Sequence, residues 1–166
     1  MGNSALADHH DIFEIKNYND PSWGINRGDA MELECNYLLM CDNLLDPTHV
    51  AWVHAGSFGQ AATKSAPLRV KKTDDGVIVH RWMLDVEPAP FYKKVVGFKG
   101  NCDRLQHYEV RYPSNALIKA IFTPAGTGGS EGKLHEDVFI MDSYNFMTPV
   151  TESKTRYYWS YLFALR

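Results

Sequence analysis

Hydrophobic and polar positions along the chain predict a helical segment in the first third. Residues 1–29 are polar and irregular, whereas residues 31–37 alternate and predict a short strand. Residues 36–54 predict a helix, because hydrophobic side chains recur there at helical spacing. Proline lacks a backbone donor and clashes with the preceding turn, so Pro47 predicts a kink or a restart within this helix. Its expected apolar face consists of Leu38, Leu39, Leu44, Leu45 and Trp52.

The remainder of the chain has the texture of strands. Asp75-Gly76, between two alternating runs, is typical of a hairpin turn, and Thr148-Pro149 predicts the turn between the last two strands. The segments rich in Pro, aromatic residues or Gly predict loops at residues 87–100 and 125–132. The expected strands cover residues 67–72, 77–85, 104–112, 116–123, 134–147 and 155–165. The predicted class is α+β, an antiparallel β-sheet with a kinked helix packed on one face.

Composition narrows the classes of protein to consider. A chain of 166 residues with 45% hydrophobic residues has the size and core content of one globular domain. A net charge of −3 gives no basic field, so we expect no nucleic-acid partner. No apolar run is long enough for a membrane span, and no signal peptide is evident. Cys35, Cys41 and Cys102 lack metal-binding spacing and suit a reducing cytoplasm, and His9 and His10 are expected at the surface.

The richest chemistry lies in the predicted helix. Asn43, Asp46 and His49 are spaced by three residues and share a helical face. His54 follows His49 by five residues, and a regular helix would splay the two by about 140°. A helix disturbed by Pro47 can bring both imidazoles to one point, and two histidines with one carboxylate form the facial triad of non-haem Fe(II) oxygenases. The plainer alternative is a chance histidine pair beside an aspartate that only ends the helix.

The whole segment resembles a known family. Asn43, Asp46, His49 and His54 match the N-x2-D-x2-H-x4-H pattern in the iron-site helix of Rieske non-haem iron oxygenases, of the vanillate O-demethylase and dicamba monooxygenase type. Residues 145–159 also resemble the late strand pair of that family. Residues 1–8 resemble the segment that joins its Rieske domain to its catalytic domain. The resemblance implies the helix-grip-like catalytic domain of these enzymes.

The same resemblance assigns a role to each matching residue. It implies that His49 and His54 are two of the three Fe(II) ligands. It implies that Asp46 is the carboxylate that holds a ligand histidine and links it to the 2Fe-2S Rieske cluster of a neighbouring subunit. A carboxylate in that position accepts the ring N–H that does not face the metal, and it raises the basicity of the ligand. Asn43 is implied to be a polar neighbour of the iron.

Two features of the family are missing from the sequence. The C-x-H and C-x2-H pairs that hold a Rieske cluster do not occur. The third iron ligand of the family is an aspartate after the last strand, and no acidic residue follows Glu152. Asp137 or Asp142 could replace it only in a geometry that the family does not use. We therefore expect residues 1–166 to be a single partial catalytic domain, without the Rieske domain and the C-terminal helix.

The function expected from the resemblance concerns the longer parent protein. It is a cytoplasmic, homo-oligomeric oxygenase in which Fe(II) and O2 demethylate or hydroxylate a small aromatic compound. A separate reductase component supplies electrons, which reach the iron through the Rieske centre of the parent protein. Two alternatives remain open for the chain itself. It could be an iron-free small-ligand-binding module of the helix-grip type, or an inactive truncated fragment.

Overall fold

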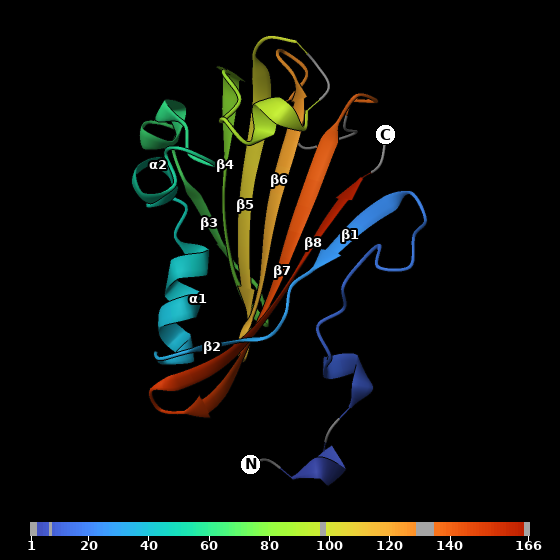
Figure 1. Ribbon diagram of the computed structural model, residues 1–166, viewed down its shortest axis with the longest axis vertical. Coiled ribbons are helices and arrows are strands. Elements are labelled where there is room, and N and C mark those ends of the chain that lie inside the picture. Colours follow the sequence, from blue (N-terminus) through green and yellow to red (C-terminus); the bar gives the residue numbers. More distant parts are fainter. Residues whose placement is uncertain (1–2, 7, 97–98, 129–134, 165–166) are drawn as a thin grey trace.

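An eight-stranded antiparallel sheet forms the centre of the molecule in the computed structural model, which describes residues 3–6, 8–96, 99–128 and 135–164 (Figure 1). The strand order is β1-β8-β7-β6-β5-β4-β3, and β2 also pairs with β8. The strands are β1 (Trp23–Arg27), β2 (Met31–Leu33), β3 (Arg69–Lys72), β4 (Gly76–Val86), β5 (Cys102–Arg111), β6 (Asn115–Pro124), β7 (Phe139–Thr151) and β8 (Lys154–Ala164). The helices are α1 (Tyr37–Leu45) and α2 (Val50–Val53), with single 3-10 turns η1 (Ser4–Leu6), η2 (His9–Asp11), η3 (Ala61–Lys64) and η4 (Tyr92–Lys94). The predicted α+β class is confirmed.

The predicted helix is divided in two, as Pro47 requires. Asn36 caps α1, because its side-chain oxygen accepts the Leu38 N–H at 2.9 Å. The Asn36 amide also donates to the Glu152 carbonyl at 2.8 Å, which joins the start of α1 to the β7–β8 hairpin (Figure 1). α1 ends at Leu45, with Asp46 as its C-terminal cap just before Pro47, and α2 begins after His49. The predicted restart of the helix is therefore confirmed.

The apolar face predicted for this helix is partly wrong. Leu38, Leu39 and Trp52 are exposed, at 54%, 61% and 68% of their surface. The stripe that packs on the sheet instead lies at i, i+3, i+4, i+7 and i+8, the spacing of a helix that rests on one flat surface. It consists of Tyr37, Met40, Cys41, Leu44 and Leu45, against Val110, Ala116 and Met147.

Three strand predictions also need correction. The stretch predicted to be irregular contains β1, which pairs with the end of β8. The strand predicted at residues 31–37 stops at Leu33, since Asn36 already caps α1. The turn near Thr148-Pro149 is wrong, because β7 continues to Thr151 and turns at residues 152–153. Pro149 is accommodated beside a register irregularity in the β7–β8 ladder. The second half of the predicted glycine-rich loop, residues 129–132, lies outside the described residues.

The two faces of the sheet carry separate cores. Side chains alternate along each strand, so Arg104, Gln106 and Tyr108 of β5 face the helices while Leu105 and His107 face away. The helix side carries two hydrophobic clusters. One is the cluster beneath α1 described above, and the other involves the segment around η4 and consists of Ala89, Tyr92, Val96, Cys102, Ala120 and Phe122. On the opposite side, Leu117, Tyr144 and Leu162 pack with Phe13, Ile15 and Trp23. The N-terminal segment therefore covers one face, and the helices cover the other.

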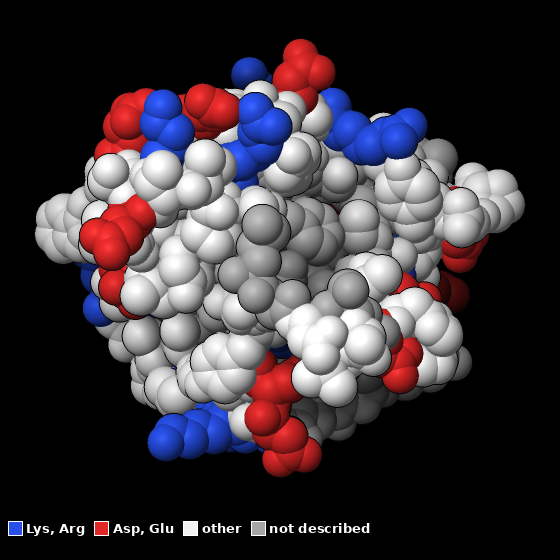
Figure 2. All heavy atoms as spheres, turned by 90° about the horizontal axis from the view of Figure 1, so that it is seen from below, with Lys and Arg blue, Asp and Glu red and all other residues white. Residues whose placement is uncertain are grey.

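The surface shows mixed charge. Figure 2 shows acidic and basic side chains interspersed around the edge of the face seen from below, rather than gathered by sign. Among the described residues, no helix is both long enough and apolar enough to cross a membrane.

Candidate metal centre and its cavity

His49 and His54 come together at the two ends of α2. His49 is the residue before the helix and His54 the residue after it, where the backbone has left helical geometry at φ −110° and ψ 23°. Their ring centroids are 5.4 Å apart, and the rings are inclined by 65°. Both residues line the same cavity. In a continuous helix, side chains five residues apart would point in directions about 140° apart. Because the helix is interrupted on both sides of α2, the two imidazoles can face each other instead.

Asp46 lies beside His49. Its Oδ2 is 3.7 Å from Nδ1 of His49, a distance too long for a hydrogen bond. That Nδ1 is buried and has no hydrogen-bond partner among the described residues. The other carboxylate oxygen accepts the Thr48 N–H at 2.7 Å. Burial raises the pKa of the Asp46 carboxyl, but hydrogen bonds from Thr48 and the nearby His49 outweigh burial and hold that pKa below its usual value. Asp46 is therefore ionised at neutral pH.

Arg81 of β4 fastens the histidine segment to the sheet. Its guanidinium, which is 3% exposed, donates to the Pro47 carbonyl at 3.0 Å and to the Thr63 carbonyl at 2.5 Å. One of these carbonyls lies before the two histidines in the chain and the other after them. Nε of Arg81 donates to Gln106 at 2.7 Å, and Gln106 in turn donates to the Tyr108 hydroxyl at 3.2 Å. This buried chain of hydrogen bonds links the histidine segment to the wall of the cavity.

The turn after His54 depends on a glycine. The His54 carbonyl accepts the N–H groups of Ser57 at 2.9 Å and of Gly59 at 2.8 Å. A side chain at position 59 would overlap the carbonyl oxygen of Val50. The chain can therefore fold back under α2 only with glycine at this point.

A cavity of about 190 Å³ lies between α2 and the sheet. Asn43 and the two histidines form one side, and strands β5 to β8 form the floor. Asn145 lies deep within it, where its amide oxygen accepts the Tyr157 hydroxyl at 2.6 Å. Among the described residues, no carboxylate lines the cavity. Its lining consists of Asn43, Leu44, His49, Val50, His54, Phe58, Tyr92, Arg104, Gln106, Tyr108, Ile118, Lys119, Ala120, Met141, Ser143, Asn145, Tyr157 and Tyr161.

All four residues of the predicted motif are thus gathered at one site, whereas the candidate substitutes for a third ligand are not. Asp142 is fully buried with Oδ2 3.2 Å from the Lys119 ammonium, on the strand face opposite the cavity. Burial raises the pKa of Asp142, against the attraction of Lys119. Asp137 lies beside His135, with its Oδ2 3.6 Å from the histidine Nδ1. Neither aspartate is among the cavity-lining residues that the structure describes.

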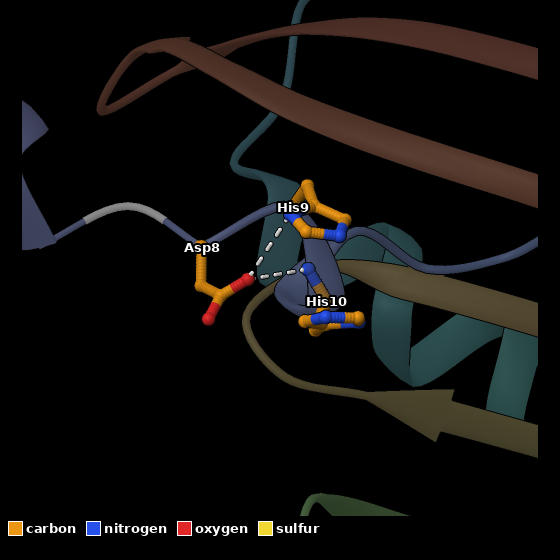
Figure 3. A group of neighbouring side chains, drawn as sticks. All are labelled: Asp8, His9 and His10. Atoms are coloured by element: carbon orange, nitrogen blue, oxygen red, sulfur yellow. Dashed lines mark hydrogen bonds and ion pairs between the residues drawn. The ribbon is translucent and has the colours of Figure 1, made fainter.

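A separate group of possible metal donors lies near the N-terminus. Asp8, His9 and His10 hold one donor atom each within 4.8 Å of one another, and among the described residues they are the only group of three such donors. Figure 3 shows that they are consecutive residues at the η2 turn, with the Asp8 carboxylate accepting the His10 N–H at 2.9 Å. All three are exposed, as predicted for His9 and His10. Asp8 here acts as the cap of a surface turn.

Sequence reasoning missed Arg81 and Arg104. Each occupies an inward position of an alternating strand, and both are almost fully buried. A charged residue at an inward strand position is rare without a partner, and this was the available signal. Neither their hydrogen bonds nor the cavity beside Arg104 could be inferred from spacing, since the partners are distant in sequence.

Several known proteins are similar to this chain over nearly its whole length. Toluene-4-sulfonate monooxygenase system iron-sulfur subunit TsaM1 of Comamonas testosteroni is 32% identical over 162 residues, covering 96% of this chain and 46% of that protein. The vanillate O-demethylase oxygenase subunit of Pseudomonas sp. (strain HR199 / DSM 7063) is 32% identical over 165 residues, covering 95% and 46% respectively. The chain thus spans about half the length of the curated relatives it matches.

The fold has a solved counterpart as well. The crystal structure of dicamba monooxygenase bound to 3,6 dichlorosalicylic acid matches with a TM-score of 0.85 at 23% identity, covering 98% of this chain and 46% of that one. This likeness confirms the predicted helix-grip-like fold. Residues 33–165 match the model of the vanillate O-demethylase oxygenase C-terminal domain, which is most of the chain. The chain therefore belongs to the vanillate O-demethylase oxygenase C-terminal domain family of Rieske-type oxygenases.

Proposed function

We propose that this domain binds Fe(II) through His49 and His54 and forms the catalytic half of an oxygenase that acts on a small aromatic compound. The observation that carries the proposal is the convergence of two imidazoles, 5.4 Å apart, at a cavity that can hold a substrate. The buried Nδ1 of His49 lacks a hydrogen-bond partner among the described residues, which suits a ring held for a ligand role. A carboxylate from outside the described residues would complete the 2-His-1-carboxylate set.

Iron bound here would supply the activation of O2 for oxidative demethylation or hydroxylation. The chain's own residues orient the site. Asp46 is ionised and its Oδ2 lies 3.7 Å from Nδ1 of His49, so a closer approach of the carboxylate would let the Nδ1–H donate to it and leave Nε2 free for the metal. Arg81 holds the segment that carries both histidines against the sheet through its hydrogen bonds to the Pro47 and Thr63 carbonyls. Asn43 supplies a polar amide at the edge of the cavity.

Asp46 also has a place in electron delivery under this proposal. Its side chain is 44% exposed, so it can meet a partner surface while its carboxylate remains beside His49. A 2Fe-2S Rieske centre in a neighbouring subunit of a homo-oligomer would dock there, supplied with electrons by a separate reductase component. The names of the relatives, which include an iron-sulfur subunit and an oxygenase component, support such a division of labour.

The cavity suits a compound with a single ring. Dry cavities of about 150 Å³ accept benzene, and this one has about 190 Å³. Phe58, Tyr92 and Tyr157 give it apolar walls, and Asn145 gives it a fixed polar point. These are the features of a site that excludes water and orients a small ligand. The aromatic substrates in the names of the relatives support the same substrate class.

A second candidate is an iron-free ligand-binding module. One observation favours it. Within the described residues, only the two imidazoles of His49 and His54 are available at the cavity as metal ligands of the expected set, whereas the cavity itself is well formed. In this case the histidines would be polar wall residues, and an aromatic ligand would bind equally well with or without metal.

Anaerobic calorimetric titration of the chain with Fe(II) distinguishes the two. We expect one binding event, weakened at least about tenfold in both His49→Ala and His54→Ala, since each removes a metal ligand. His9→Ala is the matched control, because it removes an exposed histidine from the surface group. Loss of binding in His9→Ala, with binding retained in the other two variants, would refute the proposal. Absence of metal binding together with binding of an aromatic ligand would establish the second candidate.

A further inference from the structure

Arg104 brings a positive charge into the cavity. It lies on β5, is only 2% exposed, and lines the cavity together with the two histidines. The other cation of the lining, Lys119, has its ammonium 3.2 Å from the carboxylate of Asp142 on the opposite face of the sheet. Since no described carboxylate lines the cavity, the charge of Arg104 has no counterpart there.

The protein holds the Arg104 guanidinium in place without neutralising it. Nη1 donates to the Phe58 carbonyl at 3.0 Å and to the Gln60 side chain at 2.6 Å. The guanidinium carbon lies 4.8 Å from the centre of the Tyr92 ring and 5.2 Å from that of Phe122. Nε is buried and has no hydrogen-bond partner among the described residues. The group is therefore oriented by neutral neighbours, none of which cancels its charge.

The nearest acidic residue in sequence is engaged elsewhere. Asp103 points to the other face of β5, where its two oxygens accept the N–H groups of Asp85 and Gly128 at 2.8 Å. In the described part of the chain, no ion pair within 4.0 Å includes Arg104. Burial raises the pKa of Tyr92 to about 12 and that of Cys102 to about 11, so both are neutral at pH 7 and neither acts as a counterion.

A charge in this environment is expensive to bury. An ion removed from water costs several kcal/mol unless it is paired, and Arg81, a second buried guanidinium, is close enough to be repelled by Arg104. If Arg104 served only to hold Phe58 and Gln60 in place, a neutral hydrogen-bond donor would be sufficient. The arrangement is explained if an anion enters the cavity and completes the pair, because a guanidinium presents several N–H donors to a carboxylate or sulfonate.

We propose that Arg104 anchors the anionic group of an aromatic acid, a carboxylate or a sulfonate, inside this cavity. The inference rests on the proposed function, because it takes the cavity to be the substrate site. It adds the residue that would select an anionic substrate over a neutral one. With the anion at Arg104, the aromatic ring extends through the cavity toward His49 and His54, which line the same space.

Binding of benzoate, benzenesulfonate and the neutral benzamide to the purified chain tests this, by calorimetry at pH 7. We expect the wild-type chain to prefer both anions to benzamide. Arg104→Met keeps the apolar stacking and removes the charge. It should lower the affinity for both anions about tenfold to a hundredfold, with little change in the affinity for benzamide. Arg104→Lys keeps the charge but loses the forked donors, and should give intermediate affinity. Arg156→Met, which changes an exposed arginine paired with Glu32, is the matched control.

The outcomes are distinct. Equal binding of benzoate and benzamide to the wild-type chain overturns the proposal, whether or not a variant folds. Equal weakening of all three ligands in Arg104→Met also overturns it, because Arg104 is then structural only. Failure of every aromatic probe to bind the wild-type chain overturns both this inference and the substrate cavity. Binding of Fe(II) by His49 and His54 is measured separately, so the iron site can stand while the anion anchor fails.

Discussion

Replacement of Arg81 by methionine should loosen the proposed metal site without changing a proposed metal ligand. Arg81 is 3% exposed and donates to the carbonyls of Pro47 and Thr63, which lie on either side of the histidine segment in the chain. It also donates to the side chain of Gln106. Methionine fills a similar volume but has no donor, so all three acceptors lose their partner while the packing is largely retained.

The expected cost follows from these bonds. A hydrogen bond from a charged donor contributes about 1.5 kcal/mol or more, so three well-formed bonds correspond to roughly 4 to 5 kcal/mol. Burial also lowers the pKa of the Arg81 guanidinium, which means that the protein tolerates a poorly solvated charge that the substitution removes. This relief offsets about 1 to 2 kcal/mol. The net loss is about 3 kcal/mol of a total that is typically 5 to 15 kcal/mol.

Urea denaturation and Fe(II) calorimetry measure the two consequences of Arg81→Met. We expect a clear loss of unfolding free energy, a melting temperature lower by roughly 10 °C, and Fe(II) affinity reduced at least about tenfold. Arg156→Met on the surface is the control and should change neither quantity. If Arg81→Met matches this control in both assays, the reasoning that Arg81 positions the histidine segment is refuted.

Other substitutions test separate features of the fold. The hydrogen bond from His107 lowers the pKa of Glu109 from 4.5 to about 2, against a smaller effect of burial. The ionised Glu109 carboxylate therefore stabilises the folded protein above pH 4.5, and this stabilisation is lost as the pH falls toward 2. In urea titrations across that range, Glu109→Gln should therefore remove about 2 kcal/mol of pH-dependent stability, and an unchanged pH profile would contradict this. Gly59→Ala should cost about 2 kcal/mol in thermal unfolding and weaken Fe(II) binding, whereas Gly56→Ala, with open space at its Cβ, should do neither. Asn36→Ala removes the cap of α1 and should cost about 1 kcal/mol in urea denaturation; no loss would mean that water replaces the cap.

Much of the fold could be predicted from local patterns. Alternation along residues 77–85, 104–112 and 116–123 reflects one buried and one solvated or differently packed face, which is a property of each strand by itself. The hairpin at Asp75-Gly76 and the helix break at Pro47 follow from backbone chemistry that depends on one or two residues. Local chemistry also explains the failure at β1. Trp23–Arg27 has no strong alternation, and it is a strand only because the end of β8 offers it a pairing edge.

The buried face of α1 shows the limit of periodicity. Leu38 and Leu39 are as hydrophobic as the residues that are buried, yet Tyr37, Met40 and Cys41 are the ones turned to the sheet. The pattern establishes that a helix has an apolar side. The direction of that side is decided by the cap at its start and by the surface on which it rests, both of which involve residues far along the chain.

By itself, the sequence determined which residues are candidates for the site: Asn43, Asp46, His49 and His54 form a motif within twelve residues, and its resemblance to the family pattern can be recognised from local spacing. Only the tertiary structure decided that the two histidines meet, since this depends on the interrupted helix and on the hold that Arg81 has on both of its flanks. The same is true of the cavity and of its unpaired charge. A cavity is a relation between strands and helices separated by tens of residues, and the burial of a charge is a property of its surroundings rather than of the residue.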